Sequence, residues 1–310
     1  MTDHSELLVT AEDAQSIIPD LPHLYCEPFA DYSQIPTYFV CKSARQSVTV
    51  SLSGDAGDEL FGGYNRYLMG PRLWSKLSKV PVFFRKIASM ILIAVPIQYW
   101  NWVFKQYNKL TKQQNEFVHF GEKVHRFASR LRFLNSEDDL FLSLISEPSA
   151  DQIVLKNATD SKIDSINPSF LLDPLPKNGV NDLASRMMYL DTLNYLTDDI
   201  LCKVDRAAMG NSLETRVPFL DHKIVELAWR MPLEMKINHS KGKSILRNIL
   251  YKHVPKQLIE RPKAGFSIPL GEWLKGPLKE WAEVLLESSR IEKEGYLNSN
   301  YVNQIWVEHL

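Results

Sequence analysis

The chain has 310 residues, of which 45% are hydrophobic and 24% charged, and its formal net charge is −1 at pH 7. These values are ordinary for a globular protein with one large or two small domains, and they argue against a nucleic-acid-binding protein in which charge dominates. The three cysteines are widely spaced and no secretory signal is visible, so we expect a reducing, cytoplasmic location.

The first residues of the chain alternate strand-like and helix-like patterns. The apolar run "ELLVT" (6–10) predicts a strand, helices follow, and Ser33 is placed to cap a helix that starts at Gln34. The β-branched run "SVTVSLS" (47–53) predicts a short buried strand. Because strand, helices, strand is the order of a parallel sheet, we expect an α/β fold with few strands and a large, mostly helical remainder.

Acidic residues and glycines crowd together just after the second predicted strand. The sequence "SGDAGDELFGG" (53–63) contains Asp55, Asp58 and Glu59. Glycines at the end of a strand let a phosphate approach backbone N–H groups, but neighbouring carboxylates would repel it unless a divalent cation such as Mg²⁺ lies between them. The alternative is an acidic turn that caps a helix, and the spacing alone leaves both open.

The segment "IASMILIAVPIQYWNWVF" (87–104) is long and uncharged enough to be counted as a membrane span. Pro96, Gln98 and Asn101 interrupt it, so we expect two short helices that break at Pro96. We therefore expect a docking surface for a partner domain and no membrane contact.

From about residue 183 the pattern is helical again, and residues 191–222 set charges among apolar positions. Such charges pair with one another or face a site. For most of them we expect an internal salt-bridge network, with Asp221 as the N-cap of the following helix. The charges to which this expectation applies are Lys203, Asp205, Arg206, Glu214, Arg216 and Asp221.

Residues 241–263 form a basic stretch with seven lysines and arginines and one acid, Glu260. Few aromatic residues interrupt it, so we expect no useful nucleic-acid binding. Lys263 precedes the turn-like "AGFSIP" and is placed to reach phosphate oxygens as a point charge, whereas the other cations are expected on a solvated helix face.

Three segments in one order carry a resemblance to a known family. They are "SLSGDAGDELFGGYNRY", "YLTDDILCKVDRAAMGNSLETRVPFLDH" and "ERPKAGFSIPLGEWL". Together they resemble the synthetase domain of glutamine-hydrolysing asparagine synthetases, with β-lactam synthetases as more distant relatives. The resemblance covers nearly the whole chain.

The resemblance implies a ligase reaction in two steps. The side-chain carboxylate of aspartate attacks the α-phosphate of ATP to give β-aspartyl-AMP and pyrophosphate, and ammonia released from glutamine by another domain then displaces AMP. The implied partners are ATP, Mg²⁺, aspartate and that ammonia, and a homodimer of the full-length parent is compatible with the family.

The resemblance also implies roles for single residues. Ser53 and Gly54 match positions that contact AMP, Asp58 matches the position that holds Mg²⁺ on the pyrophosphate, and Lys263 matches the lysine that reaches the phosphates. These roles agree with the chemistry, because metal and lysine stabilise charge that develops on phosphate oxygens.

Two acidic residues match positions close to the reacting groups. Asp55 matches the position tied to forming or using the acyl-adenylate, and Glu214 matches the glutamate that partners it in the β-lactam relatives. An acid there can position or deprotonate the incoming amine. A structural ion pair of Glu214 with Arg216 or Arg206 explains that glutamate equally well.

For the fold, the resemblance implies a partial parallel-sheet adenine-nucleotide-binding domain of the ATP-pyrophosphatase type. We expect a remnant of this α/β core over residues 1–70, a helical insertion over 71–182 and a helical continuation of the synthetase domain over 183–310.

The chain departs from the family pattern at three places. The pyrophosphate loop S-G-G-x-D-S is expected upstream of residue 1, Thr2 stands where the family needs a cysteine, and Ala56 replaces a glycine in "GDGGDE". We therefore expect a fragment truncated at both ends that makes no asparagine by itself. Two hypotheses follow: a piece of an ATP-dependent amide-forming ligase, or a catalytically silent interaction module.

Overall fold

The computed structural model describes residues 4, 6–111, 120–146, 180, 182–238, 241–260 and 268–310. The described residues fall into two compact units. Those up to residue 68 and from 180 onward form the first unit, and those between 69 and 146 form the second. Lys263 and the surrounding residues 261–267 lie outside the described part of the chain.

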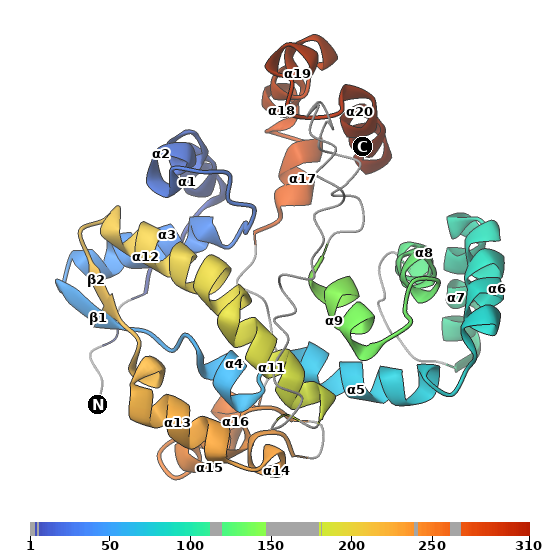
Figure 1. The fold of residues 1–310 in the computed structure, drawn as a ribbon. Helices are drawn as coiled ribbons and strands as arrows, with labels where there is room; N and C mark the ends of the chain where they lie inside the picture. The colour runs from blue at the N-terminus through green and yellow to red at the C-terminus, as the bar shows by residue number, and fades with distance from the viewer. Residues whose placement is uncertain are drawn as a thin grey trace. The chain divides into compact units, whose positions relative to one another are not determined.

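Helices dominate the first unit, and two short strands form a sheet within it (Figure 1). Helix α5 (Asn65–Leu77) begins in this unit and ends in the second. The remaining elements of the first unit, in chain order, are α1 (Ala11–Ser16), η1 (Ile18–Asp20), α2 (Leu21–Tyr25), α3 (Gln34–Arg45), β1 (Val50–Leu52), α4 (Gly57–Phe61), α11 (Leu183–Leu193), the π-helix η3 (Leu196–Leu201), α12 (Cys202–Met209), β2 (Glu214–Arg216), η4 (Pro218–Leu220), α13 (His222–Arg230), α14 (Leu233–Lys236), α15 (Ser244–Leu250), α16 (Lys256–Ile259), α17 (Leu270–Lys275), α18 (Lys279–Leu285), α19 (Ser288–Glu294) and α20 (Ser299–His309).

The sheet pairs β1 with β2 in parallel. Val50 lies opposite Glu214 and Leu52 opposite Arg216, so the carboxyl ends of both strands meet at one edge. A mostly helical structure with a small parallel sheet agrees with the predicted α/β class. The strand β2 lies where the sequence predicted only helix, because "ETR" has too few residues and too much charge to show a strand pattern.

The strand predicted over residues 6–10 is wrong. This segment has no regular secondary structure, and Leu8 is 87% exposed. Among the described residues β1 pairs only with β2, and residues 6–10 are not part of this sheet. The last residue of this segment instead starts α1, because Thr10 and Asp13 form a reciprocal capping box.

Three hydrophobic clusters lie in the first unit, and the first of them fixes the loop that follows β1 to η3 and α13. In the first, Ala56, Leu60 and Phe61 pack with Leu196 and Ala228. The second joins α3 to α12, and the third joins α17 to α1 and α3 through Trp273; their buried members are Cys41, Ala207, Ala208 and Leu213, and Ala14, Ile17, Ile35 and Trp273.

The two predicted helix caps have different outcomes. Asp221 is the N-cap of α13, and its carboxylate accepts from the backbone N–H of Lys223, as predicted. Ser33 is at the N-cap position of α3 but makes no side-chain cap hydrogen bond. Its hydroxyl is instead engaged by Asp31 and Lys203, because a buried charge pair competes for it more strongly than the helix N–H groups do.

The second unit consists of helices. After α5 come α6 (Val82–Ala94), α7 (Ile97–Thr111), α8 (Phe120–Leu131) and α9 (Glu137–Ile145), with α8 packed against α6 and α7. The predicted break at Pro96 is confirmed, and α6 and α7 meet at a bend of 91°. Within the described residues no single helix is long and apolar enough to cross a membrane, although this bent pair passes by length and composition when taken together.

Candidate functional site

The loop after β1 lies at the carboxyl edge of the parallel pair. The backbone N–H of Ser53 continues the ladder by donating to the carbonyl of Arg216 at 2.9 Å, and the chain then leaves the sheet. Ala56 adopts φ 64°, in the left-handed region that favours glycine, and its side chain is buried. An alanine here costs about 1–2 kcal/mol of strain, and packing in the first hydrophobic cluster holds it in place.

Asp58 and Lys243 converge at the start of α4. The Lys243 Nζ lies 3.1 Å from the Asp58 Oδ1, and the backbone N–H of Lys243 donates to the carbonyl of Phe61 at 2.9 Å. A Cβ added to Gly63 would lie 1.8 Å from the Asp58 Oδ1 and 2.5 Å from the Lys243 Cε. Only a glycine at position 63 therefore leaves room for this pair.

Lys243 is a site residue that the sequence analysis missed, because it assigned the cation to a solvated helix face. The signal that would have found it is the dipeptide Gly242-Lys243 just before a helix. Lys243 adopts φ 56°, and Gly242 packs so closely that an added Cβ would lie 2.0 Å from the carbonyl oxygen of Gly62. This backbone contact positions the ammonium over the glycine-rich loop.

Ser53 and Asp55 flank the beginning of the loop. The Ser53 Oγ is buried and has no hydrogen-bond partner among the described residues. Asp55 is half-buried and lies close enough to Cys41 that, together with burial, it raises the pKa of the Cys41 thiol. A buried hydroxyl without a partner is unfavourable unless a ligand or water satisfies it.

Glu214 lies at the other end of the strand pair. It opposes Val50, the first residue of β1, and its carboxylate pairs with the guanidinium of Arg216, both side chains being largely exposed. The structure therefore groups Ser53, Asp55 and Asp58 at the carboxyl edge and places Glu214 at the amino end of β2, with its side chain paired with that of Arg216.

A buried polar network packs behind the loop. The hydroxyl of Tyr64 donates to the Glu59 Oε1 at 2.7 Å, and burial raises the pKa of Glu59. Asp191 accepts from the Arg66 Nε at 2.7 Å and from the Tyr67 hydroxyl at 2.6 Å, and its pKa is raised by burial. No sequence pattern indicated the Asp191 pairings, because the partners are more than a hundred residues apart.

A second charged group connects α12 to the loop before α3. The Lys203 Nζ lies 2.6 Å from the Asp31 Oδ2 and 2.8 Å from the Ser33 Oγ. Burial and the neighbouring Asp31 raise the pKa of Asp199 to about 6. Lys203 thus pairs with a residue outside the network that the sequence predicted for it.

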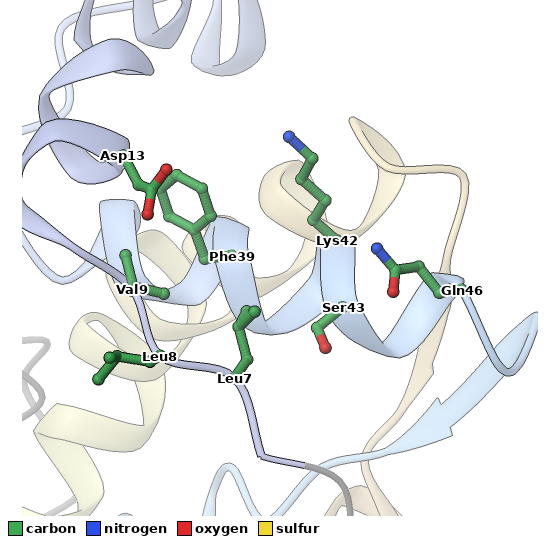
Figure 2. Close-up of a pocket in the computed structure, with 8 residues that line it drawn as sticks. All are labelled: Leu7, Leu8, Val9, Asp13, Phe39, Lys42, Ser43 and Gln46. Atoms are coloured by element: carbon green, nitrogen blue, oxygen red, sulfur yellow. The ribbon is translucent and has the colours of Figure 1, made fainter.

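A pocket of about 180 Å³ lies elsewhere in the first unit and holds none of the predicted site residues. Figure 2 shows residues Leu7, Leu8 and Val9 running along α3, with Phe39 and Lys42 on the helix side. Its lining includes neither Asp58 nor Lys243, so it is separate from the loop after β1.

The loop after β1 has the chemistry of a metal–phosphate site. No group of three or more metal-ligating side chains occurs among the described residues. Mg²⁺ bound to a nucleotide needs only one or two carboxylates, because phosphate oxygens and water complete its shell. Asp58 beside the Lys243 ammonium, with the orphaned Ser53 hydroxyl nearby in sequence, fits that requirement.

Comparison with known proteins gives matches along the whole chain. A family model described as "Asparagine synthase" matches residues 1–310. "Asparagine synthetase [glutamine-hydrolyzing] 1" of Bacillus subtilis (strain 168) is 28% identical over 309 residues, which are 97% of this chain and 43% of that protein. "Putative asparagine synthetase [glutamine-hydrolyzing]" of Mycobacterium tuberculosis (strain ATCC 25618 / H37Rv) is 29% identical over 297 residues, 93% of this chain and 40% of that protein.

A third relative is archaeal. "Putative asparagine synthetase [glutamine-hydrolyzing] 2" of Methanocaldococcus jannaschii is 33% identical over 219 residues, 70% of this chain and 37% of that protein. The chain thus spans well under half the length of these curated relatives. No solved structure matches the chain significantly.

Proposed function

The chain belongs to the asparagine synthase family, and from this premise we propose that it carries the synthetase half of a glutamine-hydrolysing asparagine synthetase. In this proposal ATP activates the side-chain carboxylate of aspartate as β-aspartyl-AMP with release of pyrophosphate. Ammonia produced from glutamine by another domain then displaces AMP and gives asparagine. The parallel pair β1–β2 would then belong to a nucleotide-binding domain of the ATP-pyrophosphatase type.

One observation supports this proposal most directly: Lys243 comes from a distant segment to the loop that carries Ser53 and Asp58, at the carboxyl edge of β1 and β2. Ligands of α/β sheets bind at that edge. The Ser53 hydroxyl is buried without a partner among the described residues, as a group that awaits a ligand would be. The Asp58–Lys243 pair supplies a carboxylate and a cation 3.1 Å apart.

Each residue has a defined part in the proposed reaction. Ser53 and Gly54 contact the AMP portion, and Asp58 would hold Mg²⁺, which offsets charge on the phosphate oxygens when it is bound. Lys243 adds a second positive charge beside the same oxygens, and Lys263 is proposed to reach them as well. Charges fixed before the reaction are worth more than mobile ones, since they need no reorganisation.

Asp55 and Glu214 are proposed to act in the second step. Asp55 follows Gly54 directly, so its carboxylate is placed near the acyl-adenylate, where it can position or deprotonate the incoming amine. In the described structure Glu214 is paired with Arg216. Its proposed role therefore requires Glu214 to give up its ion pair with Arg216. This costs little, because exposed ion pairs are worth about 0–1 kcal/mol.

The test is pyrophosphate release with ATP, Mg²⁺, aspartate and ammonium. It is run on this chain and on this chain fused behind the residues that precede the matched region in the Bacillus subtilis relative, because the match covers only 43% of that protein. We expect aspartate-dependent release from the fused protein and none from the chain alone. Release by the short chain at the rate of the fused one would contradict our placement of the nucleotide site.

Two substitutions connect the activity to the site. Asp58→Asn and Lys243→Met in the fused protein should each lower the rate by about 10²–10³, the usual loss when one stabilising charge or donor is removed. Asp198→Asn is the matched control, because Asp198 is exposed and accepts a local hydrogen bond from the Thr197 hydroxyl. Undiminished release by Asp58→Asn would refute the role of Asp58, and no release from either the short chain or the fused protein would favour the silent interaction module.

A further inference from the structure

Helix α6 buries polar side chains and exposes apolar ones. Two of its three polar residues, Arg85 and Ser89, are only 5% and 1% exposed, and the third, Lys86, is exposed. The Ser89 hydroxyl donates to the carbonyl of Ala128 at 2.6 Å, and the Arg85 guanidinium bonds the carbonyl of Leu134. A helix at a protein–water boundary normally buries its apolar face and exposes its polar one, so α6 has the reverse of the usual arrangement.

The outward face of α6 is a continuous apolar stripe. The exposed residues follow helical spacings of three and four, and they include aromatic and aliphatic side chains with up to 70% of their surface accessible. After the bend at Pro96, α7 exposes a second set at the same spacing. We call these residues the apolar stripe: Phe83, Phe84, Ile87, Met90 and Ile91 on α6, and Tyr99, Trp102, Val103 and Tyr107 on α7.

The charged residues of the segment that carries the apolar stripe are all lysines and arginines. Residues 69–111 contain seven lysines and arginines and no aspartate or glutamate, in a chain whose net charge is −1. Five of the seven are exposed, while Arg85 is buried and the side chain of Lys109 is outside the described part. The seven are Arg72, Lys76, Lys79, Arg85, Lys86, Lys105 and Lys109.

A pocket next to the stripe combines the same two properties. It has a volume of about 430 Å³ and is lined by Lys86 and Met90 of α6 and by Arg132, Phe133 and Asn135 beyond α8. The Arg132 guanidinium lies 4.7 Å from the centre of the Phe133 ring. Two cations and an amide beside two exposed apolar side chains suit a phosphate group that is attached to a hydrocarbon chain.

These features distinguish among the partners that could cover the stripe. A nucleic acid would use the cations but leave Met90 and Ile91 in water, since it offers phosphates and base faces but no aliphatic surface. A span across the bilayer is disfavoured by the 91° bend and by the exposed Lys86 and Lys105. A basic amphipathic surface with aromatic residues is typical of a segment that lies in the interface of an anionic membrane.

We propose that α6 and α7 form a peripheral binding surface for anionic phospholipid membranes, with the apolar stripe inserted at the level of the acyl chains and the Lys86–Arg132 pocket on a phosphate headgroup. This departs from the protein partner that the sequence suggested, because a basic segment without a single acid complements a lipid phosphate surface. The proposal goes beyond the proposed ligase function and does not depend on it.

The test is co-sedimentation of the full chain with vesicles of phosphatidylcholine alone and with vesicles in which about a third of the lipid is phosphatidylglycerol, at about 0.1 M salt. We expect binding to the anionic vesicles only, and binding that weakens as salt rises. Free glycerol phosphate should not compete, because it lacks the acyl surface. Equal partitioning to both vesicle types, or none to either, would overturn the proposal.

Variants separate the two parts of the surface. Lys86→Gln and Arg132→Gln should each weaken partitioning about fivefold, and Met90→Glu should weaken it about tenfold or more. Lys252→Gln and Val284→Glu are the matched controls, because both residues are exposed in the first unit and neither lies on the proposed surface. Circular dichroism checks that each variant keeps its helices.

The same variants test the other occupants. If sedimentation velocity shows a dimer that Met90→Glu dissociates while vesicle binding is absent, a second copy covers the stripe and the lipid proposal is wrong. If the control variants lose vesicle binding as much as Lys86→Gln does, the binding is not specific to this surface and the proposal is equally refuted.

Discussion

Lys203 joins α12 to the loop before α3 through one charged nitrogen. The ion pair with Asp31 is well buried, with side-chain exposures of 11% for Lys203 and 17% for Asp31. The hydrogen bond from Lys203 lowers the pKa of Asp31 even though burial acts in the opposite direction. Because the partners are distant in sequence, this pair fixes the tertiary structure of the first unit between α12 and the segment before α3.

We predict that Lys203→Met lowers the free energy of unfolding by about 3 kcal/mol near neutral pH, since it leaves a buried carboxylate without its cation. The hydroxyl of Ser33 still bonds Asp31, which keeps the loss near the lower end of the usual range. Urea denaturation measures the change. Adding Asp31→Asn should recover most of it, and a double variant no more stable than Lys203→Met would contradict the pairing.

A second prediction at this scale concerns pH. The pKa of Asp199 is raised from 3.8 to about 6 in the folded chain, so the folded state holds this proton more tightly than the unfolded state does. The stabilisation is therefore complete below about pH 4 and is lost as pH rises through about 6. Asp31 has the opposite sign, because its pKa is lowered and its contribution disappears on acidification.

We expect Asp199→Asn to be more stable than the unmodified chain at about pH 8, by up to about 3 kcal/mol, and similar to it at about pH 4. The measurement is the difference between their urea midpoints across this range, which cancels the parallel contributions of Glu59 and Asp191. Asp198→Asn is the control because it is the exposed neighbour. A constant difference at all pH values would show that Asp199 does not titrate as described.

At the scale of elements, the glycine at the start of α15 decides whether the candidate site forms. A Cβ on Gly242 would meet backbone atoms only, at 2.0 Å from the Gly62 carbonyl oxygen and 3.1 Å from the Gly63 Cα. Backbone cannot rotate away as a side chain does, so α15 must move, and Lys243 moves with it.

We predict that Gly242→Ala lowers the free energy of unfolding by about 1–3 kcal/mol, the usual range for overpacking. Thermal unfolding measures the loss. Gly271→Ala is a matched control, since its Cβ would lie an ordinary 3.5 Å from the His309 Cε1 inside α17, where alanine is about 0.5–1 kcal/mol better than glycine. Equal stability of the two variants would mean that the contact with Gly62 relaxes freely.

Local patterns predicted the elements that local interactions determine. The short strand ending before Ser53, the break at Pro96 and the Asp221 cap all follow from neighbouring residues, and the structure confirms them. The predicted burial of that strand is wrong, because Val50 and Leu52 are 47% and 75% exposed. The strand β2, the Lys243–Asp58 pair and the partner of Lys203 depend on segments far apart in sequence. No periodicity or spacing reports such contacts, so these features were missed or assigned to solvent.

The candidate site shows the same division. Glycines and acids after a strand predicted where a ligand site would lie, and the structure places Ser53, Asp55 and Asp58 at that edge. The roles of these residues, of Glu214 and of Lys263 stay predictions. Convergence of Asp58 with Lys243 required the fold, because 185 residues separate them and the Gly242-Lys243 dipeptide does not indicate which residue the lysine contacts.

At the scale of the whole molecule, charge is unevenly distributed along a chain of net charge −1. Residues 69–111 contain lysines and arginines but no aspartate or glutamate, so the rest of the chain has a net negative charge. The other basic stretch, residues 241–263, lies within that acidic remainder. Acids of the same unit are in contact with several of its cations.

Glu260 contacts two of the cations of residues 241–263. Its carboxylate pairs with Lys241, accepts from the hydroxyl of Tyr251 and lies 3.7 Å from the Arg247 guanidinium. The Lys241 and Tyr251 hydrogen bonds lower the pKa of Glu260 to about 2, so it stays ionised at any working pH. With Lys243 paired with Asp58, three of the five described cations of this stretch lie against a carboxylate of the protein.

We therefore predict that residues 241–263 do not bind DNA or RNA. A protein gains nucleic-acid affinity by releasing counterions from phosphates, and a lysine already paired with a carboxylate must break that pair first. The measurement is fluorescence anisotropy of labelled single-stranded DNA and RNA at about 0.1 M salt, where surface charges act over about 10 Å.

Lys252→Glu combined with Lys256→Glu, which reverses two exposed charges of the stretch, should leave the anisotropy unchanged. The comparison variant is Lys86→Gln with Arg132→Gln, which lowers the charge of the other basic region by the same number of residues. Weak binding that only the comparison variant reduces would come from residues 69–146, whereas tight, salt-sensitive binding lost on changing Lys252 and Lys256 would contradict the prediction for residues 241–263.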